Sequence, residues 1–169
     1  MSKSAVASDT ELHELAQFVA AMFQQRGATL SAAESCTGGW IAKTLTDIAG
    51  ASSWFEGGVI VYSYEAKEAF LGVRPETLEH HGAVSRETVS EMVAGALARF
   101  GSTVGVAVTG IAGPSGGTPD KPVGTVWIGW KRRGGYAQAE VFHFDGDREA
   151  VRRQTVAAAL RGVLKILTS

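Results

Sequence analysis

Segments whose apolar residues recur at helical spacing alternate along this chain with short segments rich in β-branched and aromatic residues. The helical pattern covers residues 10–25, 37–47, 65–71, 75–81, 85–100 and 147–167, and the strand pattern covers 28–33, 57–63, 104–109, 123–130 and 137–144. Such alternation is typical of a sheet with helices on both faces. A short turn joins the last two strands, which are therefore expected to be antiparallel. The sequence predicts an α/β fold, a three-layer α/β/α sandwich with a mixed sheet.

The same pattern indicates one domain. Residues 1–9 are expected to form a flexible N-terminus, and residues 10–169 a single domain. No linker or internal repeat divides the expected elements. A chain of 169 residues is long enough to bury a core of its own.

Two turns rich in glycine and hydroxyl side chains follow expected strands. The first is Glu34-Ser35-Cys36-Thr37-Gly38-Gly39, and the second is Thr109-Gly110-Ile111-Ala112-Gly113-Pro114-Ser115-Gly116-Gly117. A strand-turn-helix junction presents unpaired backbone N–H groups, which suit a phosphate or a developing oxyanion. The two turns predict one shared pocket at the strand ends of the sheet. Which turn takes which role stays open.

Composition and charge exclude several classes of protein. The 16 basic and 17 acidic residues give a net charge of −1, so the positive field typical of nucleic-acid-binding proteins is missing. No apolar run approaches the ~20 residues of a transmembrane helix, and no secretory signal precedes the first helix. The single cysteine excludes an internal disulfide and is typical of a reducing compartment. We expect a cytoplasmic protein that binds neither nucleic acid nor membrane.

The four histidines form no pattern typical of a metal site or of a catalytic triad. His13, His80, His81 and His143 show no His-x₃-His spacing, and one cysteine cannot form a Cys-x₂-Cys pair. A Ser-His-Asp triad would need a G-x-S-x-G elbow, which is missing. The sequence therefore predicts no metal and no cofactor.

A nucleophile activated without histidine is available around the strand expected at 57–63. Ser52 lies in the connection before this strand, and Tyr62 and Lys67 lie at its far end. A lysine acts as general base for a serine when burial lowers its pKa from about 10.4 toward neutrality, and a tyrosine hydroxyl can hold that amine. Serine and lysine are common residues, so a turn role for Ser52 and a solvated Lys67 stay open.

Cys36 is the rival nucleophile. The helix dipole stabilises a thiolate in the first turn of a helix. The other interpretation is a small buried packing residue beside two glycines, which is the usual role of a free cysteine. The residues alone leave both interpretations open.

Two charged residues flank the expected pocket. Arg148 begins the last helix, where it can bind a phosphate or carboxylate bidentately or pair at the surface with Asp145 or Asp147. Glu34 either braces its turn by accepting backbone N–H bonds or faces solvent.

Several ordered motifs resemble those of a known family. They are Ala33-Glu34-Ser35-Cys36-Thr37-Gly38-Gly39, Trp54-Phe55-x-Gly57-Gly58, Tyr62-Ser63-x-Glu65-Ala66-Lys67, Leu71-Gly72-Val73, Gly82-Ala83-Val84-Ser85, Thr109-Gly110-Ile111-Ala112-Gly113-Pro114, Lys121-Pro122-Val123-Gly124-Thr125-Val126 and Gly146-Asp147-Arg148. Together they resemble the CinA C-terminal domain family, the nicotinamide-nucleotide amidohydrolases, over roughly residues 10–166. The chain is similar to the stand-alone amidase form of that family.

The resemblance implies an activity and a set of site residues. The implied reaction is metal-free hydrolysis of the carboxamide of nicotinamide mononucleotide to nicotinate mononucleotide and ammonia, in pyridine nucleotide recycling. It implies Ser52 as nucleophile, Lys67 as general base and supporting roles for Tyr62 and Ser35, with Ser53 as a competing nucleophile. It also implies that substrate is bound by the two turns and the last helix, at Ser35, Cys36, Thr37, Gly38, Gly39, Thr109, Gly110, Gly113 and Arg148.

A second hypothesis is a non-catalytic nucleotide-binding regulatory module that keeps the pocket without the chemistry. A homo-oligomer is also expected, formed through exposed apolar strips on the helices at 86–100 or 147–167.

Overall fold

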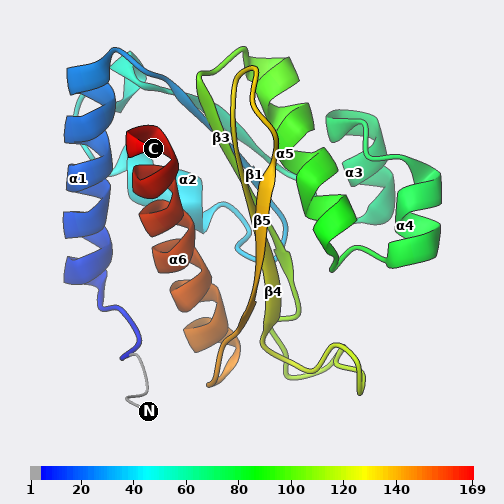
Figure 1. The fold of residues 1–169 in the computed structure, drawn as a ribbon. Helices are drawn as coiled ribbons and strands as arrows, with labels where there is room; N and C mark the ends of the chain where they lie inside the picture. The colour runs from blue at the N-terminus through cyan, green and yellow to red at the C-terminus, as the bar shows by residue number, and fades with distance from the viewer. Residues whose placement is uncertain (1–4) are drawn as a thin grey trace.

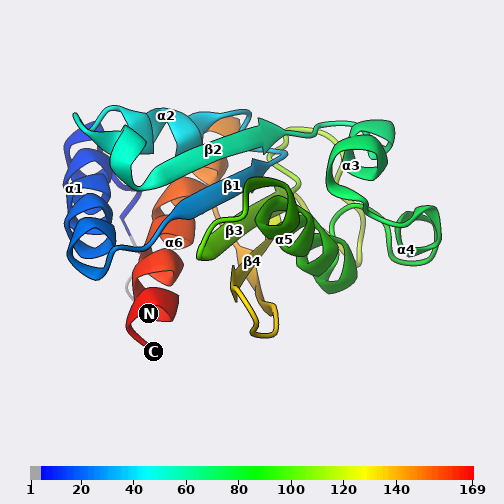
Figure 2. The same ribbon diagram turned by 90° about the horizontal axis from the view of Figure 1, so that it is seen from above.

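The computed structural model describes residues 5–169, which form a five-stranded sheet between two layers of helices (Figure 1). Its elements are, in chain order, α1 (Asp9–Arg26), β1 (Leu30–Glu34), α2 (Trp40–Thr46), the 3₁₀ turn η1 (Ala51–Ser53), β2 (Phe55–Ile60), α3 (Tyr64–Leu71), α4 (Pro75–His81), α5 (Arg86–Phe100), β3 (Val104–Gly110), β4 (Thr125–Arg132), β5 (Gln138–His143) and α6 (Arg148–Thr168). Helices α1, α2 and α6 lie on one side of the sheet, and α3, α4 and α5 on the other (Figure 2). The expected α/β/α sandwich is confirmed.

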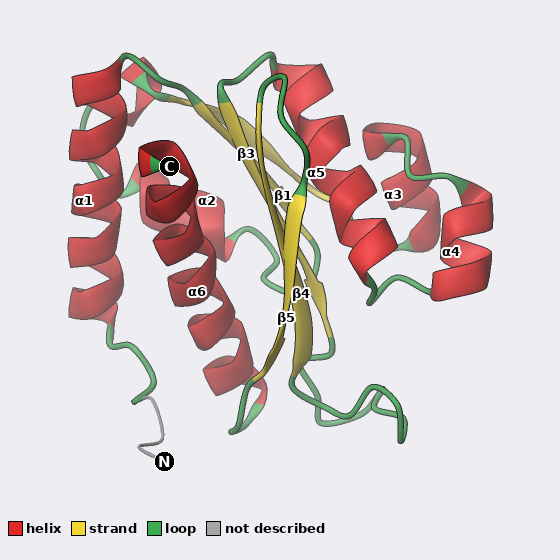
Figure 3. Cartoon of the chain, viewed as in Figure 1, coloured by secondary structure: helices red, strands yellow, loops and turns green. Residues whose placement is uncertain are grey.

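The sheet is mixed, as the sequence predicts (Figure 3). The strand order is β2-β1-β3-β4-β5, with β1 parallel to both β2 and β3. The β3–β4 and β4–β5 pairs are antiparallel. All five residues of β1 are buried, as expected of a parallel strand covered on both faces.

Polar caps fix where the helices begin. The Ser85 hydroxyl accepts the Thr88 N–H, which confirms the cap expected for α5. The Ser63 hydroxyl accepts the Ala66 N–H and begins α3. Because of this cap, β2 ends at Ile60, earlier than expected, and Tyr62 lies in the connection to α3 rather than in a strand.

Helix α1 and its cap begin before residue 10, the first residue of the expected domain. Ala7 is buried, and Ser8 forms a capping box with Glu11 at the start of α1. Residues 1–4 of the expected flexible stretch lie outside the described residues.

The apolar faces of the two long C-terminal helices are buried within the chain. On α5 these residues are Val89, Met92, Val93, Ala96 and Leu97, and on α6 they are Val151, Val156, Ala159, Leu160, Val163 and Leu167. They pack against the sheet from its two sides, as the helical spacing predicts, and pairing through exposed strips on these helices stays a prediction. Between residues 5 and 169, no helix is both long and apolar enough to cross a bilayer.

Gly95 sets how closely α5 approaches α3, the helix that carries Lys67. A Cβ built on Gly95 would overlap the carbonyl oxygen of Leu71, the last residue of α3. Main-chain atoms cannot move aside cheaply, so a glycine is required at this helix crossing.

We predict that Gly95→Ala destabilises the protein by about 1–3 kcal/mol, although alanine in a helix is normally favoured over glycine by ~1 kcal/mol. Urea denaturation provides the measurement. Ala94→Gly, at the exposed neighbouring position, is the control and is expected to cost only the ~1 kcal/mol of helix propensity. An alanine variant more stable than wild type would contradict the close contact.

Candidate active site

The two glycine-rich turns lie at the same edge of the sheet. Strands β1 and β3 are parallel, with Glu34 beside Val108, so the residues that follow these two positions are neighbours. The Val61 N–H donates to the Glu34 carbonyl at 2.8 Å, which brings the end of β2 to the same edge. The connections that follow three strands therefore meet there.

The side chain of Lys67 reaches this edge of the sheet, and it is only 1% exposed. Its Nζ donates to the carbonyl oxygens of Val61 at 2.9 Å and Tyr62 at 3.2 Å, and lies 3.0 Å from the Ser35 hydroxyl. No ion pair formed by residues 5–169 includes Lys67. A buried amine without a carboxylate partner is unusual and favours a chemical role.

Burial lowers the pKa of Lys67 below its ordinary value of 10.5, because the charged form loses its hydration. A neutral amine has two hydrogens and one lone pair. The two carbonyl oxygens can only accept, so they take both hydrogens. The lone pair of neutral Lys67 is then directed at the Ser35 hydroxyl, which is the arrangement required to remove its proton.

The expected pairing of Ser52 with Lys67 is wrong. Ser52 lies in η1, before the first residue of β2, whereas Lys67 lies after the last. The six residues of β2 separate them by about 20 Å at ~3.3 Å per residue. Ser53 lies in the same turn, where its hydroxyl donates to the Gly50 carbonyl. Both serines thus lie at the opposite edge of the sheet.

Cys36 is a buried packing residue rather than an activated thiol. Burial raises the pKa of its thiol to about 12, with the neighbouring Glu34 carboxylate adding to the effect. The thiolate is therefore rare at neutral pH, which argues against the rival mechanism.

Glu34 braces the turn from within. Its Oε1 accepts the Thr37 hydroxyl at 2.6 Å and the Ile41 N–H at 2.9 Å, and its Oε2 accepts the Ala42 N–H at 3.0 Å. The protein's own carboxylate therefore occupies the first turn of α2. This end of α2 is not free to receive a substrate phosphate.

Arg148 joins three segments around the site. Its Nη2 donates to the Tyr62 hydroxyl at 2.9 Å, and its Nη1 donates to the Gly113 carbonyl at 2.8 Å. The Tyr62 backbone carbonyl thus accepts from Lys67, whereas its hydroxyl accepts from Arg148, and the residue as a whole is 60% exposed. The alternative pairing of Arg148 with Asp145 or Asp147 does not occur.

The remaining predicted binding residues shape the backbone of the two turns. Gly38 and Gly39 have φ of 60° and 101°, a left-handed conformation that other residues rarely adopt. The Thr109 hydroxyl donates to the Ala83 carbonyl at 2.9 Å and so holds the connection between α4 and α5. At Gly110, a Cβ would lie 2.6 Å from the Val126 side chain of β4.

Arg152 is a residue of the site that the sequence did not suggest. It donates to the carbonyl oxygens of Cys36 and Thr37, from the side of the sheet opposite α3. The only sequence signal is its spacing, one helical turn after Arg148.

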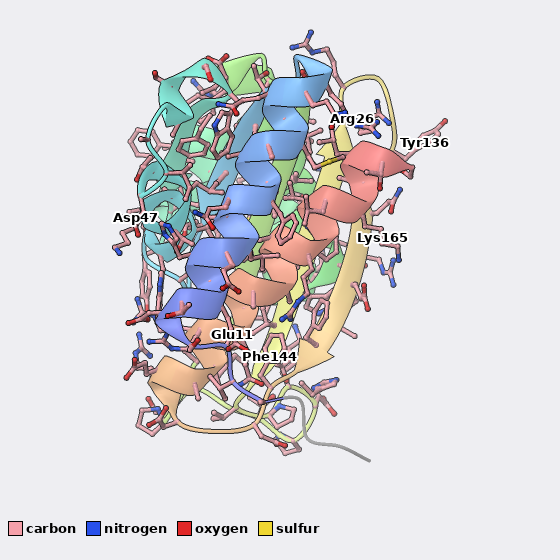
Figure 4. The ribbon with its side chains drawn as sticks, turned by 90° about the vertical axis from the view of Figure 1, so that its left-hand side faces the viewer. Glu11, Arg26, Asp47, Tyr136, Phe144 and Lys165 are labelled. Atoms are coloured by element: carbon pink, nitrogen blue, oxygen red, sulfur yellow. The ribbon has the colours of Figure 1, made fainter. Side chains whose placement is uncertain are left out.

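A cavity lies elsewhere in the molecule. It has a volume of about 740 Å³ and lies between α6 and the edge strand β5, with Trp130, Phe142 and Gly162 in its wall. Phe144 and Lys165, which also line it, are labelled in Figure 4 on the flank formed by α1, α6 and β5. None of the predicted site residues lines this cavity. Over residues 5–169, no three His, Cys, Asp or Glu side chains are placed to share a metal ion.

Comparison with known proteins gives consistent matches over nearly the whole chain. The family model described as CinA C-terminal domain matches residues 12–167. A protein from Escherichia coli (strain K12) named nicotinamide-nucleotide amidohydrolase PncC is 51% identical, over 91% of this chain and 93% of that protein. The protein of the same name from Pseudomonas putida is 52% identical, over 83% of this chain and 88% of that protein.

A solved structure also matches. The crystal structure of competence/damage inducible protein CihA from Agrobacterium tumefaciens has a TM-score of 0.90 and is 43% identical, covering 98% of this chain and 99% of that one.

We predict that the Cys36 thiol reacts slowly with a thiol-specific disulfide reagent in the folded protein, because the thiol is both buried and protonated. Absorbance at pH 8 measures the reaction. The same protein unfolded in guanidinium is the control, and it should release one equivalent at once, because the chain has one cysteine. Rapid labelling of the folded protein would revive the thiol mechanism.

Proposed function

The chain belongs to the CinA C-terminal domain family, and we propose that it hydrolyses the carboxamide of nicotinamide mononucleotide to nicotinate mononucleotide and ammonia. About half of its residues are identical to those of relatives named for nicotinamide-nucleotide amidohydrolysis. The observation that carries the chemistry is the 3.0 Å contact between the buried Lys67 amine and the Ser35 hydroxyl.

In the first half of this reaction, Ser35 is the nucleophile and Lys67 the general base. The Ser35 Oγ attacks the carboxamide carbon while its proton passes to the neutral Lys67 amine, which gives a tetrahedral oxyanion. The oxyanion collapses, the carbon–nitrogen bond breaks, and the Lys67 ammonium returns the proton to the departing nitrogen. Ammonia leaves, and an ester of Ser35 remains.

The second half uses the same two groups on water. A water molecule attacks the ester carbon and gives a proton to Lys67. The second tetrahedral intermediate then releases the Ser35 oxygen, which takes that proton back. The acid product leaves with both side chains restored. Each half therefore moves one proton onto Lys67 and off again, without a metal in either step.

The two turns have different roles in this proposal. The 35–39 turn carries the nucleophile, so its backbone N–H groups are the ones that lie near the oxyanion. Glu34 already occupies the start of α2, so the 5′-phosphate is assigned to Arg148 and the loop that contains Gly113. A phosphate dianion is a stronger partner for a guanidinium than the hydroxyl and carbonyl that Arg148 now contacts.

Two expectations about the whole molecule remain predictions. A homo-oligomer is tested by light scattering, and a cytoplasmic location by cell fractionation.

We predict that Ser35→Ala and Lys67→Met each lower kcat by about 10³-fold or more, because each removes a group that bonds or protonates the reacting atoms. Ammonia release from nicotinamide mononucleotide, with chromatographic separation of the acid product, is the measurement. Ser52→Ala is the matched control and should keep wild-type activity, since Ser52 lies at the opposite edge of the sheet.

The outcomes separate the hypotheses. Wild-type protein that binds the nucleotide but yields no acid over hours would support the regulatory module instead. Activity lost in Ser52→Ala and retained in Ser35→Ala would overturn the Ser35 assignment.

We predict that kcat rises with pH to a plateau, with a midpoint below the ordinary lysine value of 10.5. Burial disfavours the ammonium form of Lys67, and only the neutral amine accepts the Ser35 proton, so activity is lost as pH falls through the lowered pKa. Initial rates across pH measure the profile, and circular dichroism at each pH checks that the fold is intact. A rate that falls over this range, or a midpoint at or above 10.5, would count against Lys67 as base.

A further inference from the structure

Arg152 binds the backbone of the nucleophile turn rather than an acidic side chain. Its Nε donates to the Cys36 carbonyl at 3.0 Å, and its Nη2 donates to the Thr37 carbonyl at 3.1 Å. Its guanidinium lies over the Trp40 ring, 5.4 Å from the centroid, which holds the plane of the fork. No ion pair among residues 5–169 includes Arg152. The hydrogen bonds of Arg152 therefore go to two backbone carbonyls of the turn.

These contacts fix the direction of a neighbouring N–H group. In residues 5–169 the only cis peptide bond is Gly113–Pro114, so the bond between Cys36 and Thr37 is trans. In a trans peptide the C=O and N–H point in opposite directions. Because the Cys36 carbonyl is directed at Arg152, the Thr37 N–H points away from α6, which lies on the opposite side of the sheet from the Lys67 helix α3.

A second hydrogen bond fixes the direction of the preceding N–H group, that of Cys36. The Ser35 carbonyl accepts the Gly38 N–H at 3.1 Å, which fixes the peptide between Ser35 and Cys36. Among the described residues, no backbone carbonyl accepts the N–H of Cys36 or of Thr37. Two unpaired donors thus follow directly after the Ser35 side chain.

We propose that Arg152 is a positioning residue that holds the Thr37 N–H group as a donor for the oxyanion formed at Ser35, beside the Cys36 N–H group that the Gly38–Ser35 hydrogen bond orients. This inference rests on the proposed function, in which Ser35 attacks a carboxamide. Donors fixed in advance stabilise the developing charge without having to reorganise, which is why such groups contribute strongly to catalysis. Arg152 touches no reacting atom and acts only through the turn.

The residues around Arg152 fit this role. A Cβ at Gly38 would lie 3.4 Å from Arg152 Nη2, so the guanidinium packs at van der Waals distance from this position of the turn. The Thr37 carbonyl also accepts the Trp40 N–H at 3.1 Å, so Arg152 reinforces a turn that already closes on itself. A planar fork is required to reach two successive carbonyls, and a lysine ammonium can satisfy only part of that geometry.

The experiment compares Arg152→Met with Arg153→Met in the ammonia assay. Arg153 is the matched control because it lies over the same Trp40 ring, at 4.9 Å, but bonds Ala7, Asp9 and Glu149 instead of the turn. For Arg152→Met, kcat is expected to fall by about 10²–10³-fold with KM changed less than about threefold. Arg153→Met should keep kcat within about twofold, and Arg152→Lys should fall between the two.

A second readout separates positioning from loss of structure. A boronic acid analogue of the substrate forms a tetrahedral anion on the Ser35 oxygen and so mimics the oxyanion. Its inhibition constant should rise in Arg152→Met by about the same factor as kcat falls, while affinity for the acid product stays within about threefold. A variant whose turn had merely collapsed would lose affinity for both ligands.

The outcomes are distinguishable from failure of the proposed function. Wild-type protein without amidase activity overturns the proposed function itself. Active wild type with an unchanged kcat in Arg152→Met, or with boronate and product affinities lost equally, overturns the role of Arg152. If Arg152→Met does not fold, Arg152→Lys decides by the same two measurements.

Discussion

The contact on which the candidate site depends is a lysine amine bound between two backbone carbonyls. Transfer of an ammonium from water into a protein interior is costly without a carboxylate partner, and Lys67 has none. Burial lowers the pKa of Lys67 and so favours the neutral amine, the form that can act as a base. The carbonyls of Val61 and Tyr62 then orient that base. Their position follows from the Ser63 cap, which ends β2 and turns the chain into α3.

The backbone of the 35–39 turn and of the start of α2 is hydrogen-bonded by side chains from two sides. Glu34 accepts from the start of α2, and Arg152 donates to the carbonyls of Cys36 and Thr37. The turn thereby directs the Ser35 side chain to Lys67 and leaves the backbone donors beside it free. The buried Glu34 carboxylate and the partly buried Arg152 guanidinium, which bond mainly to the backbone of the turn, therefore make it rigid while it still has free hydrogen-bonding groups.

The sequence predicted the elements, the mixed sheet and the meeting of the two turns, because these follow from periodicity and from the geometry of parallel strands. It failed at the partner of Lys67. Ser52 precedes the strand that Lys67 follows, so strand length alone separates them, whereas Ser35 follows the parallel neighbour β1 and reaches the same edge. The carboxyl ends of parallel strands meet at one edge of a sheet, which favours Ser35, whereas the assignment of Ser52 followed from its position in a motif. The contacts of Arg152 could not be predicted. They depend on how α6 is rotated about its axis, and the helical periodicity does not determine that rotation accurately enough to place a single side chain.

Arg148 and Arg152, one turn apart on α6, differ in how easily their hydrogen bonds can be exchanged. The partners of Arg148 are an exposed tyrosine hydroxyl and one loop carbonyl, which can bond water when a ligand phosphate takes the guanidinium. The partners of Arg152 belong to the partly buried turn, where the Cys36 carbonyl accepts no other hydrogen bond from the described residues and would be left unsatisfied at about 1–3 kcal/mol. Arg148 is therefore suited to exchange partners on substrate binding and Arg152 to keep them. Because one rigid helix carries both, phosphate capture at Arg148 can proceed while the donors beside Ser35 stay in place.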